Sequence, residues 1–136
     1  IDEFTFERLF KGKYISDEDY KNAIKKKQEL SHKIYEALKI FGILLTPTNF
    51  DLPFDLGDLK QINKYYMRHA RSPFNISGNP AISIPCGISK TNLPIGFQIV
   101  GRKNSEELIA NIADEFLLKI DWENIRKKKI IKKLFA

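Results

Sequence analysis

The stretch 74–102, FNISGNPAISIPCGISKTNLPIGFQIVGR, constrains the fold more than any other part of the chain. It contains four of the seven glycines and three of the six prolines. Two apolar runs, at 81–84 and 95–100, are rich in the β-branched residues that suit a buried strand. The polar segment SKTNL between them has the length of a hairpin connection. The sequence therefore predicts two antiparallel strands, near 81–86 and 95–100, joined by a tight reversal.

A long amphipathic helix is predicted ahead of these strands, from residue 16 to residue 41. Ser16 and Asp19 have the spacing of a helix-capping pair, and Gly42 suits the C-terminal cap. Between the caps, apolar residues recur at helical spacing and form one stripe: Tyr20, Ile24, Ile34, Leu38 and Phe41. A shorter helix is predicted over 2–11, with Gly12 ending it.

The next segments follow from shorter patterns. Residues 43–46 are predicted to form a buried strand that ends at the turn T-P-T of 46–48. The segment 49–63 has little periodicity and is predicted to be a loop, with a helical turn near Leu59.

Two more helices are predicted. The first covers 65–76 and is interrupted near Pro73. The second covers 105–120, with Asn104 as its N-cap. Its apolar stripe consists of Leu108, Ile112, Phe116 and Ile120.

The order of these elements indicates an α/β fold in which helices pack on a small mixed sheet. Only three strands are predicted, and the chain has the size of one domain. Two of the strands are almost uniformly apolar, which suggests a sheet that is covered on both faces within something larger.

The positive charge of the chain is concentrated in its tail. The net charge is +6, from 23 basic and 17 acidic residues. Six of the basic residues lie in 126–133, and without them the charges balance. The body therefore has no charge excess for binding nucleic acid. In the basic tail, 124–136, apolar residues lie among six basic residues, and we favour a terminal helix that docks on the body over one that lies on an anionic membrane or meets an acidic partner.

Cysteine content and hydropathy bear on location. The single cysteine, Cys86, excludes an internal disulfide, and a cytoplasmic location is expected. No apolar run approaches the roughly 20 residues of a membrane span. The first residue is isoleucine, so we expect that the chain begins inside a longer reading frame or has been processed.

The glycines and prolines of 74–102 also carry a resemblance. The pattern N-x-S-G-x-P-A-I-S-I-P-C-G, followed by L-P-I-G-F-Q-I-V-G, resembles the C-terminal portion of the amidase signature family. The T-P-T turn at 46–48 resembles the same family, and the likeness covers most of 16–118. Members hydrolyse carboxylic amides on a larger α/β/α sandwich and include the A subunit of glutamyl-tRNA amidotransferase. The resemblance implies that 1–136 is the C-terminal part of an amidase domain and lacks the catalytic N-terminal part.

These residues offer no catalytic set. No serine lies in a G-x-S-x-G elbow, His32 and His69 are expected on helix surfaces, and Cys86 is expected to be a small core residue. No spacing fits a metal site, and no cofactor is expected. In the resembled family, a nucleophilic serine, a bridging serine and a lysine base precede the matched region, and no such Gly/Ser-rich run occurs in this sequence. We therefore expect no catalytic residue here and no amide hydrolysis by this chain alone.

The resemblance instead assigns these residues to a pocket. The family's T-P-T and N-x-S-G-x-P turns lie near the acyl-binding side of the site. This makes six residues candidate pocket neighbours: Thr46, Pro47, Thr48, Phe74, Asn75 and Ser77. The alternative, that Gly78 and Pro80 only turn the backbone, stays open. In the amidotransferase members of the family, an acidic residue before the second turn holds the amino group of glutamine; 66–71 contains no acid, which favours a general amidase.

Two functions follow from this comparison. In the first, the partner of the chain is the N-terminal portion of the amidase, and the complete enzyme acts on a small-molecule amide. In the second, the chain is a non-catalytic interaction module derived from an amidase. It would bind its partner through the apolar face that the N-terminal portion otherwise covers. We favour the first, because the chain does not begin with methionine and both pocket-type turns are present.

Overall fold

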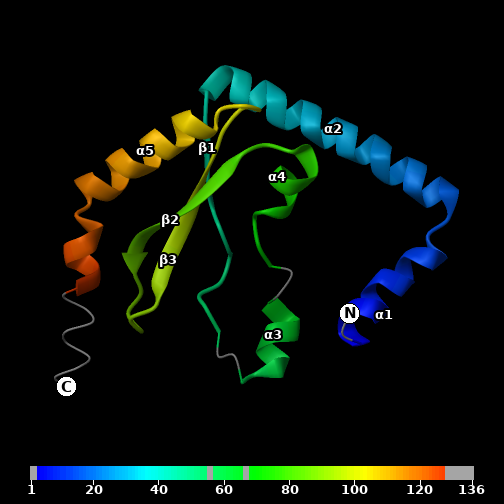
Figure 1. Ribbon diagram of the computed structural model, residues 1–136, viewed down its shortest axis with the longest axis horizontal. Helices are drawn as coiled ribbons and strands as arrows, with labels where there is room; N and C mark the ends of the chain where they lie inside the picture. The colour runs from blue at the N-terminus through cyan, green and yellow to red at the C-terminus, as the bar shows by residue number, and fades with distance from the viewer. Residues whose placement is uncertain (1–2, 55–56, 66–67, 128–136) are drawn as a thin grey trace.

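The computed structural model describes residues 3–54, 57–65 and 68–127 (Figure 1). Its elements in chain order are α1 (Glu3–Phe10), the 3-10 helix η1 (Lys11–Tyr14), α2 (Asp17–Phe41), β1 (Leu44–Pro47), α3 (Leu59–Tyr65), α4 (Ser72–Ser77), β2 (Ala81–Ile88), β3 (Pro94–Val100) and α5 (Glu106–Lys119). Residues 122–127 form a last helical segment. No helix within these described ranges is long and apolar enough to cross a bilayer.

The sheet has three strands in the order β1-β3-β2, and both pairings are antiparallel. The predicted fold class, helices packed on a small sheet, is confirmed, and each predicted strand is found within two residues of its bounds. The sheet is antiparallel rather than mixed. The predicted hairpin explains part of this, because β2 reverses into β3 through Ser89, whose N–H donates to Leu93 O at 2.8 Å. β1 then pairs with the other edge of β3, which makes β3 the central strand.

Two separate hydrophobic cores lie on the two faces of the sheet. Consecutive residues of β3 point to opposite faces, so each contributes to a different core. On one face, Val100 packs against residues of α2 and α4: Ile34, Leu38 and Phe74. On the other face, Ile99 packs against residues of β2 and α5: Ile84, Ile109 and Ala113.

The caps of α2 were predicted correctly. Ser16 Oγ accepts a hydrogen bond from the Asp19 N–H at 3.1 Å, and Gly42 ends the helix at a positive φ of 80°. The first α-helix, predicted over 2–11, ends at Phe10 as expected, but Gly12 does not stop the helical backbone. The backbone there continues as η1 to Tyr14, because Gly12 keeps a negative φ and does not turn the chain.

Only the C-terminal part of α2 packs on the body. Ile34 and Leu38 of the predicted stripe are buried, although Phe41, in the last turn, is exposed. Tyr20, near the start of the helix, is 63% exposed. The reason is length, since 25 residues at about 1.5 Å each make a helix about 37 Å long. Its N-terminal half and α1 reach away from the sheet (Figure 1).

Three details of the shorter helices differ from the prediction. Pro73 does not interrupt a helix but lies in the first turn of α4, where its missing N–H is not needed. Asn104 is not the N-cap of α5, because its φ of +63° turns the chain before the helix begins. The buried stripe of α5 is centred on Ile109 and Ala113, while Leu108 is 51% exposed. The helix is rotated this way because Ile109 contacts the sheet beside a glycine at the end of β3.

Candidate functional site

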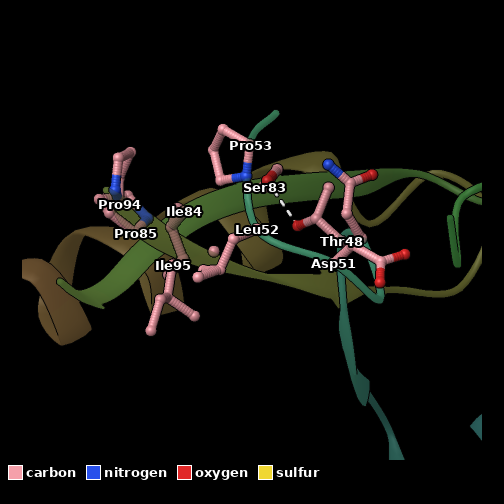
Figure 2. Close-up of a pocket in the computed structure, with 11 residues that line it drawn as sticks. Thr48, Asp51, Leu52, Pro53, Ser83, Ile84, Pro85, Pro94 and Ile95 are labelled. Atoms are coloured by element: carbon pink, nitrogen blue, oxygen red, sulfur yellow. Dashed lines mark hydrogen bonds between the residues drawn. The ribbon is translucent and has the colours of Figure 1, made fainter. Parts of the chain in front are cut away.

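A hollow of about 270 Å³ lies where β1 passes into the segment 49–53 (Figure 2). Thr48 lines it just after β1, Ser83 lines it from β2 and Gly96 from β3. Pro85 and Pro94 lie at one end of the hollow, and Asp51 lies near the other (Figure 2). We call this space the hydroxyl hollow.

Thr48 and Ser83 meet across the central strand. Their hydroxyl oxygens are 2.7 Å apart, and either can donate. Gly96 lies between them, and a Cβ at this position would be 3.7 Å from each hydroxyl oxygen. Whichever hydroxyl accepts in this pair still has its own proton to donate. The pair can therefore orient a carbonyl group that enters the hollow.

Gln98 holds the T-P-T turn in place. Its side chain is buried, with only 3% of the residue exposed. The Nε2 amide donates to Thr46 Oγ1 at 2.9 Å, to Ala70 O at 3.0 Å and, at a longer 3.4 Å, to Pro47 O. Ala70 N–H in turn donates to Thr48 O at 3.1 Å. Sequence reasoning missed this residue, although a lone amide in an otherwise apolar strand is a signal that could have found it.

Of the T-P-T turn, only Thr48 lines the hydroxyl hollow. Thr46 and Pro47 instead border an open depression of about 400 Å³ on the α5 face of the sheet. Cys86 borders the same depression and is exposed. The expectation that Cys86 is a core residue is wrong, because it lies at the bulge of the edge strand β2.

The three candidates from α4 lie elsewhere. Phe74 is buried in the core on the α2 face, and Asn75 is exposed. Ser77 is buried, with its Oγ 2.6 Å from Asn79 Oδ1 and 3.2 Å from Phe74 O. Asn79 Nδ2 donates to Gly101 O at 2.9 Å, which links the turn before β2 to the end of β3. The structure thus brings one of the six candidates, Thr48, into the hydroxyl hollow.

A second hollow, of about 210 Å³, shares the segment 49–53 as a wall with the first. Tyr65, Arg68 and Arg71 line its other side. Arg68 Nε lies 3.1 Å from Asp51 Oδ2, but the N–H is not aligned for a hydrogen bond. The contact is therefore an ion pair, and this carboxylate oxygen has no hydrogen-bond partner among the described residues.

The two histidines differ from each other. His32 is exposed on α2, as predicted. The prediction of a helix surface is wrong for His69, which forms an isolated β-bridge with Asn49 instead. Its Nδ1 is buried and has no hydrogen-bond partner within the ranges that the structure describes.

The hydroxyl pair of Thr48 and Ser83 can donate a hydrogen bond to a carbonyl group. Among the described residues, no histidine, lysine or carboxylate is hydrogen-bonded to the hydroxyl of Thr48 or of Ser83. Nucleophilic catalysis by a hydroxyl needs such a base. The same part of the chain contains no group of three side chains that could hold a metal ion.

Known proteins resemble this chain in sequence and in structure. One glutamyl-tRNA(Gln) amidotransferase A subunit of Clostridium acetobutylicum is 35% identical over 99 residues, which are 71% of this chain and 21% of that protein. The crystal structure of the corresponding A subunit from Thermotoga maritima matches with a TM-score of 0.61 and 31% identity, over 79% of this chain and 25% of that one. A 6-aminohexanoate cyclic dimer hydrolase complexed with substrate matches with a TM-score of 0.67 at 21% identity, over 86% and 27%. This last match shows the fold alone.

These matches cover most of this chain but only a small part of each relative. The chain spans only about a fifth to a quarter of the length of the amidotransferase subunits. Within this chain, however, residues 3–110 match the amidase family, which is well over half of the sequence. The resemblance in the Gly/Pro pattern is therefore confirmed, and the chain belongs to the amidase family.

Proposed function

We propose that this chain is the C-terminal, pocket-forming part of an amidase that hydrolyses carboxylic amides, and that it is inactive alone. The observation that carries the proposal is the extent of the match. The family likeness covers residues 3–110, yet the relatives are about four to five times as long as the part matched. The lack of a base beside Thr48 and Ser83 among the described residues supports a role in binding rather than in bond breaking.

Exposed aromatic side chains support a larger assembly. The rings of Phe6 and Phe10 stack with centroids 5.8 Å apart, and Phe10 contacts Tyr14 edge-on at 5.9 Å. All three are exposed. Tyr20 and Ile24 are also exposed, on the side of α2 that is buried further along the helix. Exposed aromatic clusters of this kind mark interfaces, and the remaining amidase portion is the partner we propose for this one.

The sheet offers a second contact area. Within the described ranges, β1 and β2 are both edge strands, each with one unpaired side. On the α5 face, Leu45 is 61% exposed beside the depression that Cys86 and Phe116 border. Further strands could pair with these edges, and apolar residues of the remaining portion could cover this face.

Two substrate classes are supported by different observations. The amidotransferase subunits among the relatives favour the alternative, in which this chain belongs to an amidotransferase that acts on glutamine. The segment before α4 favours a general amidase, because it carries Arg68 and Arg71 and no acid. We propose the general amidase, since Arg68 is paired with Asp51 and the guanidinium group of Arg71 would repel an ammonium group.

A chimera tests the proposed function. The matching quarter of the Thermotoga maritima protein would be replaced by residues 3–110, and ammonia release from simple aliphatic and aryl amides would be measured. We expect release by the chimera and none by either part alone. A matched variant of the chimera, Thr48→Val, should raise KM because it removes a hydroxyl from the hollow. A chimera that melts cooperatively but releases no ammonia would contradict the proposal and favour the interaction module.

A further inference from the structure

We call the second hollow, of about 210 Å³, the arginine hollow. It is lined by Tyr65, Arg68, Arg71 and the segment 49–54, and its described lining carries more positive than negative charge. Two guanidinium groups face one carboxylate, Asp51. At about 210 Å³, the hollow has room for roughly seven water volumes of about 30 Å³ each, so it suits a small charged group.

The guanidinium group of Arg68 has N–H donors that the ion pair with Asp51 does not use. Only its Nε is close to Asp51, at 3.1 Å, whereas a guanidinium carries five N–H donors. Its Cζ lies 5.5 Å from the centroid of the Tyr65 ring, a cation–π distance that holds the planar group over the ring. The two Nη groups can therefore serve a ligand without breaking the ion pair.

Arg71 is the second cation of the hollow. It is exposed at the N-cap position of α4, and its side chain makes no capping hydrogen bond. Among the ion pairs of the described residues, the carboxylate of this hollow is matched with Arg68 and not with Arg71. Within the described lining, one positive charge is thus not matched by a carboxylate, and planar guanidinium groups bind carboxylates in a bidentate manner.

The arginine hollow and the hydroxyl hollow share the wall formed by 49–53, and Asp51 lines both. The two hollows therefore lie side by side along this segment. We propose that the arginine hollow binds the carboxylate of an anionic amide substrate, such as the monoamide of a short dicarboxylic acid, whose amide end reaches Thr48 and Ser83. The anion site follows from the arginines, and the assignment of the amide end rests on the function proposed above.

Titration of the isotope-labelled chain tests this inference by NMR. Three probes of the same length differ only in their second end: glutaramate is anionic, glutaramide is neutral and 5-aminopentanamide is cationic. We expect glutaramate to bind about tenfold more tightly than glutaramide, the difference that a charge-assisted contact of about 1.4 kcal/mol makes. We expect the cationic probe to bind most weakly, and the preference to shrink as salt screens Arg71.

Arg71→Gln should abolish the preference for glutaramate without unfolding the chain, because the Arg71 side chain caps no helix. The matched control is Arg126→Gln, since Arg126 pairs with Glu123 in the last helical segment and lines neither hollow. Retained preference in Arg71→Gln, equal binding of the three probes, or no binding of glutaramate to the folded chain would each overturn the inference.

The chimera separates this inference from the proposed function. If it hydrolyses amides but does not prefer glutaramate, the arginine hollow is not a substrate site and the proposed function stands. If the 136-residue chain binds glutaramate through Arg71 while the chimera stays inactive, the anion site stands and the proposed function fails.

Discussion

The hydroxyl oxygens of Thr48 and Ser83 lie 2.7 Å apart over Gly96, so the two edges of the sheet are joined across its central strand. A Cβ at position 96 would lie 3.7 Å from each hydroxyl oxygen, so the pair leaves room there for a methyl group at ordinary contact distance. The same pair gives the hydroxyl hollow its polar floor, while prolines form one end of it. A packing feature of the sheet thus also shapes the candidate site.

Replacing Gly101 by alanine should destabilise the chain more than replacing Gly96 by alanine. At Gly101 a Cβ would lie 2.8 Å from Ile109 Cγ2 and closer still to Ser105 Oγ, so Gly101→Ala should lower the free energy of unfolding by about 1–3 kcal/mol. Gly96→Ala is the matched control, because its Cβ meets only contacts of 3.4 Å and longer. We expect it to change stability by less than about 1 kcal/mol. Urea unfolding measures both, and equal effects would contradict the close packing at Gly101.

Removing the amide of Gln98 should also destabilise the chain. Gln98→Met leaves Thr46 Oγ1 and Ala70 O without their buried donor, which should lower the free energy of unfolding by about 1–3 kcal/mol. Gln28→Met on the exposed side of α2 is the control and should stay within about 0.5 kcal/mol of the parent chain. A Gln98→Met chain as stable as the control would show that this network does not hold the T-P-T turn.

Cys86 should react with iodoacetamide in the folded chain, because it is exposed at the bulge of β2. Mass spectrometry of the alkylated protein, with and without denaturant, checks this. In the chimera the same thiol should react more slowly, since we propose that the remaining amidase portion covers this face. Alkylation only in denaturant would contradict the exposed placement, and unchanged reactivity in the chimera would place the covered surface elsewhere.

The exposed aromatic residues of α1 and η1 should make the isolated chain associate. We expect association in solution that survives high salt and removal of 124–136, because apolar contacts are not screened. The double variant Phe10→Ser, Tyr14→Ser should weaken it, whereas Leu118→Ser, an isolated exposed residue on α5, should not. Sedimentation or light scattering gives the mass. A monodisperse monomer would contradict this prediction, and association lost in salt or on truncation would assign it to the basic tail.

Local signals predicted much of the fold. The Gly/Pro spacing of 74–102 predicted the hairpin, and Ser16, Asp19 and Gly42 predicted both ends of α2. These features depend on neighbours in the sequence. The apolar stripe of α2 was less informative, because Leu38 and Tyr20 fit the same pattern while only Leu38 is covered. A periodic pattern shows which side of a helix is apolar and not what packs on it.

The contacts that build the site are long-range, which is why the sequence did not reveal them. Thr48 and Ser83 are 35 residues apart, and Thr46 and Gln98 are 52 apart. The pairing of β1 with β3 that brings them together has no local signal. Family resemblance predicted Thr48 as a pocket residue, a role that stays a prediction, as do those of Thr46, Pro47, Phe74, Asn75 and Ser77. The tail beyond residue 127, where a terminal helix is predicted, lies outside the described residues.

The central claim is that this chain contributes to a substrate pocket but contains no catalytic set. The most direct test is to measure ammonia release from a simple amide by the purified 136-residue chain. We expect no release above the uncatalysed rate, because no base is hydrogen-bonded to the hydroxyl of Thr48 or of Ser83 among the described residues. Turnover by the chain alone, lost in Cys86→Ala or in Ser77→Ala, would contradict that account.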